Sequence, residues 1–510
     1  MVQPGPGGLG SGRVLPVEGS CAGGLRSHPQ TKEKCGVFGI WGRGAEGGLA
    51  HQAYLGLYAQ QHRGQESAGI AVSDGKKLTG ITGMGLVPEI FDSDTLATLE
   101  KAAGQNGGKG GAIGHNRYST AGGSLACNAQ PLLENYIGGQ VAVAHNGNLI
   151  NAELLRLRFE EAGHLFHTTS DTEVIVHLLA SPHQQRGPDP LAATLRRLQG
   201  AFSLVMLFPD RIEAARDPWG WRPLVLGYLP DPPHRPVVAS ETIALDVVGA
   251  KFEREVEPGE VVTLSDAGVS SRRFADRADR AAYCVFEHVY FANPASAVFG
   301  QNVQVTRELM GEKLAAEAPV EADYVVPMPD SGRTAAVGYA RASGIPYREG
   351  IVPNRYVGRT FIKPTQAERA AAVRLKLNVV REIVQGKRLI VVDDSIVRGT
   401  TTKTKVDQIR QAGAKEIHLR ISCPPIKHPC YFGVDFASRD QLIAHGRSVE
   451  EIRGFLGVDS LHYLSLDGLL SCMSRPRRDY CTACYSGDYR LDPEHPVSVE
   501  VSSAQMTLIP

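Results

Sequence analysis

Residues 388–402 read RLIVVDDSIVRGTTT and join an apolar run, two carboxylates and a Gly-Thr-Thr turn in one segment. The apolar run lacks alternation, which is typical of a strand in a parallel sheet that is covered on both faces. Asp393 and Asp394 follow at its carboxyl end, the edge of an α/β sheet where ligands bind. Gly399 then precedes a predicted helix, whose first N–H groups suit a phosphate. The segment therefore predicts a phosphate-binding loop in an α/β domain.

The two aspartates need a different partner, because they would repel the phosphate. We expect Asp393 and Asp394 to accept hydrogen bonds from sugar hydroxyls or to hold a magnesium ion. Thr400 and Thr401 add hydroxyl donors beside the helix N-terminus. The alternative is an ordinary strand followed by a capped helix, with both acids solvated. The combination of all these features in one run favours a binding site.

This run resembles the phosphoribosylpyrophosphate (PRPP) signature of type I phosphoribosyltransferases, whose fold is a parallel sheet flanked by helices. The resemblance implies that Asp393 and Asp394 contact the ribose hydroxyls and the metal ion. It assigns the 5′-phosphate to the loop and the first helical turn, which contain Ser395, Arg398, Gly399, Thr400 and Thr401.

A second loop, PMPDSGRT at 327–334, follows the apolar run 324–327 and resembles the pyrophosphate loop of the same family. By that likeness Ser331 would help to hold magnesium and Arg333 would contact PRPP. Read alone, this loop is also compatible with a turn capped by an aspartate or a serine.

The basic stretch NRYVGRTFIKP at 354–364 lies between these two loops. We expect it to be a flexible loop that closes over the pyrophosphate and excludes water, with Arg355, Arg359 and Lys363 facing the ligand. An exposed basic loop without a ligand is the alternative.

The first half of the chain has a different sequence pattern. Residues 1–34 are rich in Gly, Pro and Ser and have few large apolar side chains, so we expect a disordered or removed leader. From 35 to 271, short β-branched runs alternate with glycine turns, which predicts a mostly β domain with a few helices. The charged stretch 272–283 is the predicted boundary with the second half.

Cys35 begins a predicted strand directly after the leader. A strand cysteine is usually a small packing side chain. A thiol with a pKa of about 8.5 needs a base, and a residue at a new N-terminus has one in its own α-amino group, with a pKa of about 7.7–8.0. Cleavage of the Lys34–Cys35 bond would therefore create a nucleophile and its base in one residue.

Four further segments accompany this cysteine: HRGQESAG at 62–69, GHNRYST at 114–120, AHNGN at 144–148 and TSDTE at 169–173. HNGN alone is also a hairpin-turn signal. Together they resemble the class II glutamine amidotransferase domain, an N-terminal-nucleophile hydrolase with an αββα sandwich. The resemblance implies that Cys35 is catalytic. By the same likeness, Arg117 would hold the α-carboxylate of glutamine and Asp171 its α-ammonium group. Asn146 and Gly147 would form the oxyanion hole.

The 510 residues include nine cysteines, too few and too irregularly spaced for a disulfide scaffold, which indicates a reducing compartment. Four of them, Cys284, Cys430 and the CxxC pair Cys481 and Cys484, offer thiolates that suit zinc or an iron–sulfur cluster, and a lone CxxC is also compatible with redox chemistry. Their placement resembles the iron–sulfur branch of the glutamine PRPP amidotransferase family. That resemblance implies a [4Fe–4S] cluster held by these four cysteines.

The composition argues against nucleic-acid-binding and membrane-spanning proteins. The chain has 54 basic and 54 acidic side chains, which argues against nucleic acid as a partner. No apolar run approaches the roughly 18 residues of a membrane span, so we expect no membrane partner and a cytoplasmic protein.

Both resemblances meet in the amidophosphoribosyltransferase family. We expect a leader over 1–34, an α+β glutaminase domain over 35–271, an α/β phosphoribosyltransferase domain over 284–470, and a C-terminal segment over 471–510. The resemblance implies glutamine and PRPP as substrates, Mg²⁺ and a [4Fe–4S] cluster as cofactors, purine nucleotides as feedback inhibitors, and a homotetramer. The implied reaction is the first committed step of purine synthesis, with ammonia channelled between two sites.

Two other classes share parts of this pattern. Glucosamine-phosphate synthase and asparagine synthetase share the glutaminase half, but their second halves would lack the VVDDSIVRGTT run. A non-enzymatic PRPP-sensing regulator would keep the PRPP-binding loop beside a degenerate glutaminase domain. Such a regulator needs no nucleophile, whereas this chain has Cys35.

Overall fold

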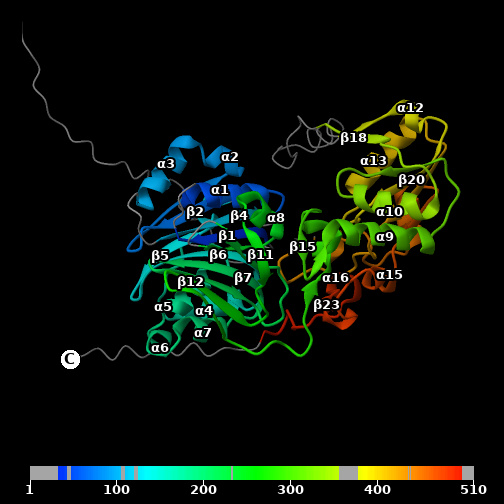
Figure 1. The fold of residues 1–510 in the computed structure, drawn as a ribbon. Coiled ribbons are helices and arrows are strands. Elements are labelled where there is room, and N and C mark those ends of the chain that lie inside the picture. The colour runs from blue at the N-terminus through cyan, green and yellow to red at the C-terminus, as the bar shows by residue number, and fades with distance from the viewer. Residues whose placement is uncertain are drawn as a thin grey trace, which may run out of the picture.

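The computed structural model describes residues 33–42, 48–104, 110–119, 125–230, 234–354, 377–434, 436 and 438–496. Figure 1 shows two lobes, with the blue, cyan and first green elements in one lobe and the later green, yellow and orange elements in the other. Within these residues no helix combines the length and the apolar character needed to cross a membrane.

The first lobe contains two antiparallel sheets. The first has seven strands in the order β11-β9-β10-β1-β4-β2-β3: β11 (Lys251–Glu255), β9 (Val225–Leu229), β10 (Arg235–Ala239), β1 (Glu33–Trp41), β4 (Gly111–Ser119), β2 (Ser67–Ser73) and β3 (Leu78–Met84). The second has six strands in the order β13-β12-β8-β7-β6-β5: β13 (Gly268–Arg273), β12 (Glu260–Ser265), β8 (Arg211–Arg216), β7 (Gly200–Phe208), β6 (Gly139–Leu149) and β5 (Leu132–Tyr136).

These sheets stack face to face, and the period of two along each strand explains how. In β1, Val37 packs against side chains of the second sheet such as Ala142, whereas Phe38 and Ile40 face the opposite way, toward helices. The helices on the outer face of the first sheet are α1 (Leu49–Ala59), α2 (Val87–Ile90), α3 (Ser93–Ala102) and α8 (Thr242–Val248). Those packed against the second sheet are α4 (Ala152–Glu161), α5 (Glu173–Ala180) and α7 (Pro190–Leu195). The short helix α6 (Pro182–Gln185) lies between α5 and α7 in the chain, and the 3₁₀ turn η1 (Ala126–Asn128) precedes β5. The predicted αββα sandwich is confirmed.

The second lobe is built on a parallel sheet of four strands in the order β17-β20-β21-β22. Its strands are β17 (Tyr324–Pro327), β20 (Arg388–Asp393), β21 (Glu416–Ile421) and β22 (Ser460–Tyr463). Among the described residues, the helices of this lobe are α9 (Val303–Glu317), α10 (Arg333–Ser343), α12 (Arg381–Val384), α13 (Thr400–Gln411), α14 (Val449–Leu456) and α15 (Leu466–Ser471), with the 3₁₀ turns η4 (Arg439–Gln441) and η5 (Arg477–Asp479). Two short antiparallel pairs are added, β15 (Ala297–Val298) with β16 (Gln301–Asn302) and β18 (Ile351–Pro353) with β19 (Leu377–Val379). Residues 389–392 are fully buried, and the predicted α/β fold with a parallel sheet is confirmed.

A junction joins the lobes through elements from distant parts of the chain. β14 (Tyr283–Cys284) pairs in parallel with β23 (Tyr480–Cys481), and η2 (Glu287–Phe291) is a turn of π-helix. β23 and α16 (Ala483–Ser486), red in Figure 1, lie where the lobes meet. Trp221 of the first lobe stacks on Phe432 of the second, with ring centroids 4.4 Å apart.

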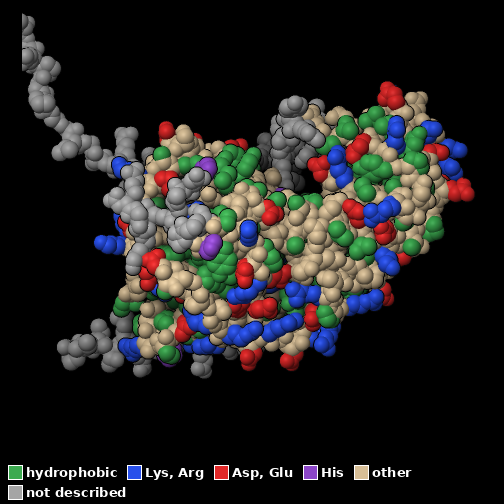
Figure 2. Space-filling model, in the orientation of Figure 1, with side chains coloured by type: hydrophobic (Ala, Val, Ile, Leu, Met, Phe, Trp, Pro, Cys, Tyr) green, Lys and Arg blue, Asp and Glu red, His purple; other side chains and the backbone are tan. Residues whose placement is uncertain are grey.

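The surface in Figure 2 mixes basic and acidic side chains over most of the visible face, with a row of Lys and Arg along the lower edge of the first lobe. This distribution agrees with the charge balance of the sequence.

Two candidate active sites

The candidate nucleophile lies on the central strand of the first sheet. Cys35 is only 1% exposed and stands directly opposite Arg117 in the pairing of β1 with β4. Directly opposite residues of antiparallel strands have Cα atoms about 4.5–5.5 Å apart. The fold therefore brings together two residues that the sequence separates widely.

Asn146 and Gly147 lie on β6, in the sheet that faces the nucleophile strand. The HNGN motif is therefore part of a strand and not a hairpin turn. Ser240 links the two sheets here, because its hydroxyl accepts a hydrogen bond from the Val37 N–H (3.0 Å) and one from the Asn146 side chain (3.4 Å). Sequence reasoning missed Ser240, which no motif marks.

Arg117 and Asp171 have defined partners in the structure. The fully buried Arg117 guanidinium donates to Glu66 at 3.0 Å. Asp171 accepts the Leu149 N–H at 2.8 Å, at the end of the same strand as Asn146. Burial raises the pKa of Asp171, but the adjacent His145 and several hydrogen bonds lower it below its usual value. An ionised Asp171 beside β6 suits an ammonium group.

The second candidate site lies at the carboxyl end of β20. Asp393 ends the strand, Asp394 follows, and both side chains are 5% exposed. Gly399 has a φ of 77° and precedes α13, whose first backbone bond within the helix runs from Lys403 N–H to the Gly399 carbonyl at 2.8 Å. The preceding N–H groups of the first turn are therefore available to an anion.

The two predicted PRPP loops meet at this edge of the sheet. The Met328 N–H donates to the Val392 carbonyl at 2.8 Å. A Cβ atom built on Gly332 would lie 3.1 Å from the Asp393 Cα, so the loop at 327–334 packs closely on the strand end. The peptide bond between Pro329 and Asp330 is cis.

The remaining side chains of this site lie in two groups. Ser331 is half-buried in the loop, and Arg333 at the start of α10 lies 3.4 Å from Asp330 and 3.2 Å from Glu349. On the other loop, Ser395 donates to Asp394, and the exposed Arg398 donates to Gln441 at 3.1 Å. Thr400 and Thr401 are exposed on the first turn of α13, and Arg355, Arg359 and Lys363 lie outside the described residues.

The carboxylate pair has unusual electrostatics. Burial and the neighbouring Asp394 raise the pKa of Asp393 well above its usual value, although Lys405 opposes the shift. A cation at this position would relieve the repulsion between the acids.

The four candidate cluster cysteines converge on the junction. Cys284 stands opposite Cys481 in the pairing of β14 with β23, the Cys430 sulfur accepts the Phe432 N–H at 3.3 Å, and the Cys484 carbonyl accepts the Lys427 and His428 N–H groups. All four thiols are free of disulfides. Burial is the main cause that raises the pKa of Cys284 to about 12 and of Cys481 to about 11.

These thiols fit a soft metal or a cluster in chemical type. As they stand, however, no three His, Cys, Asp or Glu side chains of the described part of the chain are arranged to hold a metal ion. Because the buried thiols favour the protonated form, binding of a metal would have to release protons.

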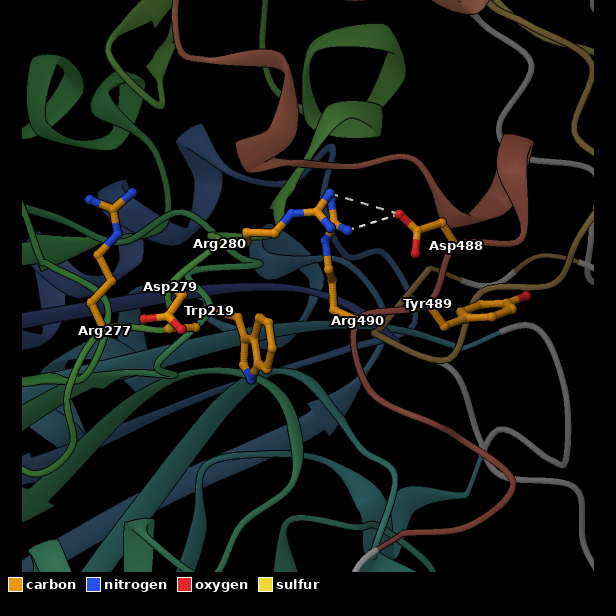
Figure 3. Close-up of a pocket in the computed structure, with 8 residues that line it drawn as sticks. Trp219, Arg277, Asp279, Arg280, Asp488, Tyr489 and Arg490 are labelled. Carbon is orange, nitrogen blue, oxygen red and sulfur yellow. Dashed lines mark hydrogen bonds and ion pairs between the residues drawn. The ribbon is translucent and has the colours of Figure 1, made fainter.

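A cavity of about 500 Å³ lies beside the junction, between the stretch 277–280 and the stretch 488–490 (Figure 3). Its arginines face acids: Arg490 bonds Asp488 at 2.8 Å, and Arg280 lies 4.0 Å from the same carboxylate. Because its cations are paired, this cavity is not assigned an anionic ligand.

Known proteins resemble both the first lobe and the chain as a whole. A family model described as a glutamine amidotransferase domain matches residues 115–247. An amidophosphoribosyltransferase of Methanothermobacter thermautotrophicus is 48% identical over 463 residues, which cover 90% of this chain and 95% of the relative. The amidophosphoribosyltransferase of Bacillus subtilis is 47% identical, covering 90% and 94%.

Solved structures agree over both lobes. The glutamine PRPP amidotransferase from B. subtilis, complexed with ADP and GMP, matches with a TM-score of 0.81 and 45% identity, covering 90% of this chain and 98% of that one. A structure described as the allosteric regulatory enzyme of purine biosynthesis also matches with a TM-score of 0.81, at 46% identity, covering 89% and 96%. The chain therefore belongs to the amidophosphoribosyltransferase family.

Proposed function

We propose that the two lobes divide the family reaction between them, with glutamine hydrolysis in the domain 35–271 and phosphoribosyl transfer in the domain 284–470. As a member of this family, the protein converts glutamine, PRPP and water into 5-phosphoribosylamine, pyrophosphate and glutamate, the first committed step of de novo purine synthesis. The division is carried by one observation: the buried nucleophile strand and the acidic edge of the parallel sheet lie in separate lobes of one chain.

In the first lobe, the Cys35 thiolate attacks the amide carbon of glutamine. The oxyanion that forms accepts hydrogen bonds from the Asn146 side chain and the Gly147 N–H, which stabilise the tetrahedral intermediate. Arg117 holds the glutamine α-carboxylate and Asp171 holds its α-ammonium. Supporting this division of roles, Ser240 bonds both the nucleophile strand and Asn146.

The base in this mechanism is the α-amino group of Cys35 after removal of residues 1–34. This amine takes the thiol proton and gives it to the departing ammonia. Intact-mass analysis of the active enzyme tests the step: we expect a chain that lacks residues 1–34, whereas an active chain that retains Lys34 contradicts it.

In the second lobe, the N–H groups around Gly399, Thr400 and Thr401 bind the 5′-phosphate, together with Ser395 and Arg398. Asp393 and Asp394 orient the ribose hydroxyls and, with Ser331, would hold magnesium. A magnesium ion held there would supply positive charge for the pyrophosphate leaving group. We assign the screening of the pyrophosphate from water to Arg333 and to three basic residues of the stretch 354–364, namely Arg355, Arg359 and Lys363. Ammonia from the first lobe then reaches the anomeric carbon.

We propose that the protein belongs to the iron–sulfur branch of the family, with two of the four cluster cysteines in the C-terminal segment 471–510. Cys284, Cys430, Cys481 and Cys484 would hold a [4Fe–4S] cluster with a structural role, supported by their convergence on the junction. Elemental analysis tests this assignment: iron and acid-labile sulfide in about equal amounts support it, and stoichiometric zinc overturns it.

We further propose that purine nucleotides inhibit the enzyme, that it forms a homotetramer and that it is cytoplasmic. The solved B. subtilis relative is complexed with ADP and GMP, which supports nucleotide control. Inhibition assays with purine nucleotides and sedimentation analysis are the corresponding measurements.

A direct assay tests the overall function. With glutamine and PRPP we expect equimolar glutamate and pyrophosphate, and with ammonia in place of glutamine we expect pyrophosphate alone. PRPP binding without turnover would instead indicate a sensor, for which none of the relatives described above provides support.

A further inference from the structure

The short segment that follows Cys430 in the second lobe lies directly on the strand that carries the candidate oxyanion hole. The side chain of Asn148 on β6 donates to the Tyr431 carbonyl at 2.8 Å. The buried Arg222 guanidinium donates to the Phe432 carbonyl, from Nε at 3.2 Å and from Nη2 at 2.7 Å. Two consecutive carbonyls of this segment are thus held by side chains of the first lobe.

Gly433 makes the closest approach. Its φ is 91°, and a Cβ atom built on it would lie 3.0 Å from the carbonyl carbon of Gly147 and 3.2 Å from the Gly147 Cα. Glycine is the residue that tolerates this φ and leaves room for the neighbouring backbone. The Ala201 carbonyl fills the position where a Gly147 side chain would stand, so the Gly147 backbone is confined on two sides.

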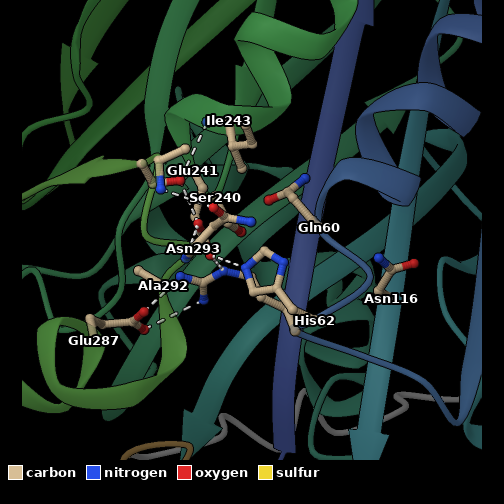
Figure 4. A network of polar contacts seen from close by, with 12 residues as sticks. Gln60, His62, Asn116, Ser240, Glu241, Ile243, Glu287, Ala292 and Asn293 are labelled. Atoms are coloured by element: carbon tan, nitrogen blue, oxygen red, sulfur yellow. Dashed lines mark hydrogen bonds and ion pairs between the residues drawn. The ribbon is translucent and has the colours of Figure 1, made fainter. Parts of the chain in front are cut away.

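The segment itself is firmly anchored. Phe432 is 2% exposed and stacks on Trp221 with an interplanar angle of 16°. Arg222 also bonds Glu287 at 3.0 Å, and Glu287 bonds Arg63 at 2.6 Å. This buried network, seen in part in Figure 4, extends from the junction into the first lobe.

The same network reaches the nucleophile strand. A Cβ atom built on Gly36, the residue after Cys35, would lie 3.4 Å from Cδ of Arg63. The second lobe therefore contacts both halves of the glutaminase site: the Gly147 backbone directly, and the Cys35 strand through Arg63 and Glu287.

We propose that residues 431–433 are a positioning element for glutamine hydrolysis, which sets the Gly147 N–H relative to Cys35. This inference rests on the proposed oxyanion role of Asn146 and Gly147. An oxyanion hole is sensitive to such positioning, because its donors must lie about 2.7–3.1 Å from the oxygen of the transition state. Gly433, Asn148 and Arg222 are thus positioning residues, which act through the Gly147 backbone.

Gly433→Ala in the full-length enzyme is the main test. The added methyl displaces Gly147, so we expect kcat for glutamine hydrolysis to fall about 30-fold, below the 10²–10³-fold loss of a deleted oxyanion donor. KM for glutamine and ammonia-dependent synthesis should stay within about 2-fold of wild type, because neither depends on the oxyanion geometry. Gly457→Ala is the matched control, since Gly457 has a φ of 73° and a Cβ there meets nothing within 4 Å.

Two further variants keep the inference testable if Gly433→Ala does not fold. Asn148→Ala removes only the bond to Tyr431, and we expect kcat for glutamine hydrolysis to fall about 5-fold. In that case, Asn148→Ala alone tests the inference. Wild-type glutamine kcat in a folded Gly433→Ala enzyme, or in Asn148→Ala alone, overturns the inference. Asn146→Ala tests the underlying assignment separately, because wild-type hydrolysis in that variant shows that the oxyanion role itself is wrong.

Discussion

The two lobes assemble their sites in opposite ways. In the second lobe, one strand, one loop and one helix start place Asp393, Asp394 and Gly399 together within a few residues of sequence. In the first lobe, Cys35 and Asn146 come from facing sheets. Ser240 connects the strand of Cys35 to Asn146, because its hydroxyl bonds the Val37 N–H, 203 residues away, and the Asn146 side chain. A parallel sheet therefore concentrates a site in a local motif, whereas a sandwich builds one from distant segments.

Cys35→Ala should separate the lobes most completely. Without the thiol no acyl intermediate forms, so we expect glutamine-dependent synthesis to fall by at least about 10⁴-fold, a loss typical of removing a nucleophile. Ammonia-dependent synthesis should persist, because the second lobe is unchanged. Steady-state assays with each nitrogen source measure both activities.

Cys472→Ala is the matched control, since Cys472 is also a buried thiol but lies in α15's C-terminal turn in the other lobe. It should keep both activities. Loss of ammonia-dependent synthesis in Cys35→Ala would show that the two sites are not separable.

The sequence predicted the local site better than the dispersed one. The run 388–402 contains its own strand, turn and helix start, so its geometry follows from backbone rules alone. The four motifs of the first lobe predict candidate site residues, but they do not predict the contacts of those residues. Ser240, Glu241 and Glu287 carry no motif, and their roles arise from contacts such as Arg63 with Glu287, 224 residues apart.

Glu241→Gln tests how strongly the first lobe depends on those long-range contacts. Glu241 is fully buried and bonds His62, Arg63, the Asn293 N–H and the Ser296 hydroxyl (Figure 4). Breaking a buried ion pair on one side costs about 3–5 kcal/mol, so we expect the free energy of unfolding to fall by that amount. Chemical denaturation measures it. The exposed Glu450→Gln is the control, and we expect it to leave the free energy of unfolding nearly unchanged, because a solvent-exposed ion pair contributes little to stability.

The same group predicts a pH dependence. Burial raises the pKa of Glu241, but the charges of Arg63 and His62 and the hydrogen bonds from His62 and Ser296 together outweigh burial. The folded pKa of Glu241 therefore lies well below that of an unfolded glutamate, about 4.3. A depressed pKa stabilises the fold above about pH 4.3, and this stability is lost as the pH falls below it. Melting temperatures from pH 7 to pH 3.5 should therefore fall less steeply in Glu241→Gln than in wild type, and parallel curves would contradict this.

Asp394→Asn should affect only the local site. Loss of one carboxylate weakens the predicted magnesium and ribose contacts, so we expect kcat/KM for PRPP to fall about 100-fold. Glutamine hydrolysis in the absence of PRPP should be unchanged. Asp467→Asn on the same lobe, an exposed acid paired with Arg477, should match wild type in both assays. Unchanged PRPP kinetics in Asp394→Asn would count against the assignment of the acidic edge.

Gly399→Ala should give the smallest effect and shows how far backbone geometry alone defines the local site. An alanine at a φ of 77° costs about 1–2 kcal/mol, and its methyl would also clash with the Ile443 side chain, which would have to shift. Because the strain distorts the helix start that faces the predicted phosphate, we expect KM for PRPP to rise about 10-fold with little change in kcat. Gly386→Ala has a similar φ of 71° in open space, so it should show the same backbone strain without the clash and keep the wild-type KM. An equal rise of KM in both variants would mean that general destabilisation, and not the geometry of the phosphate loop, controls PRPP binding.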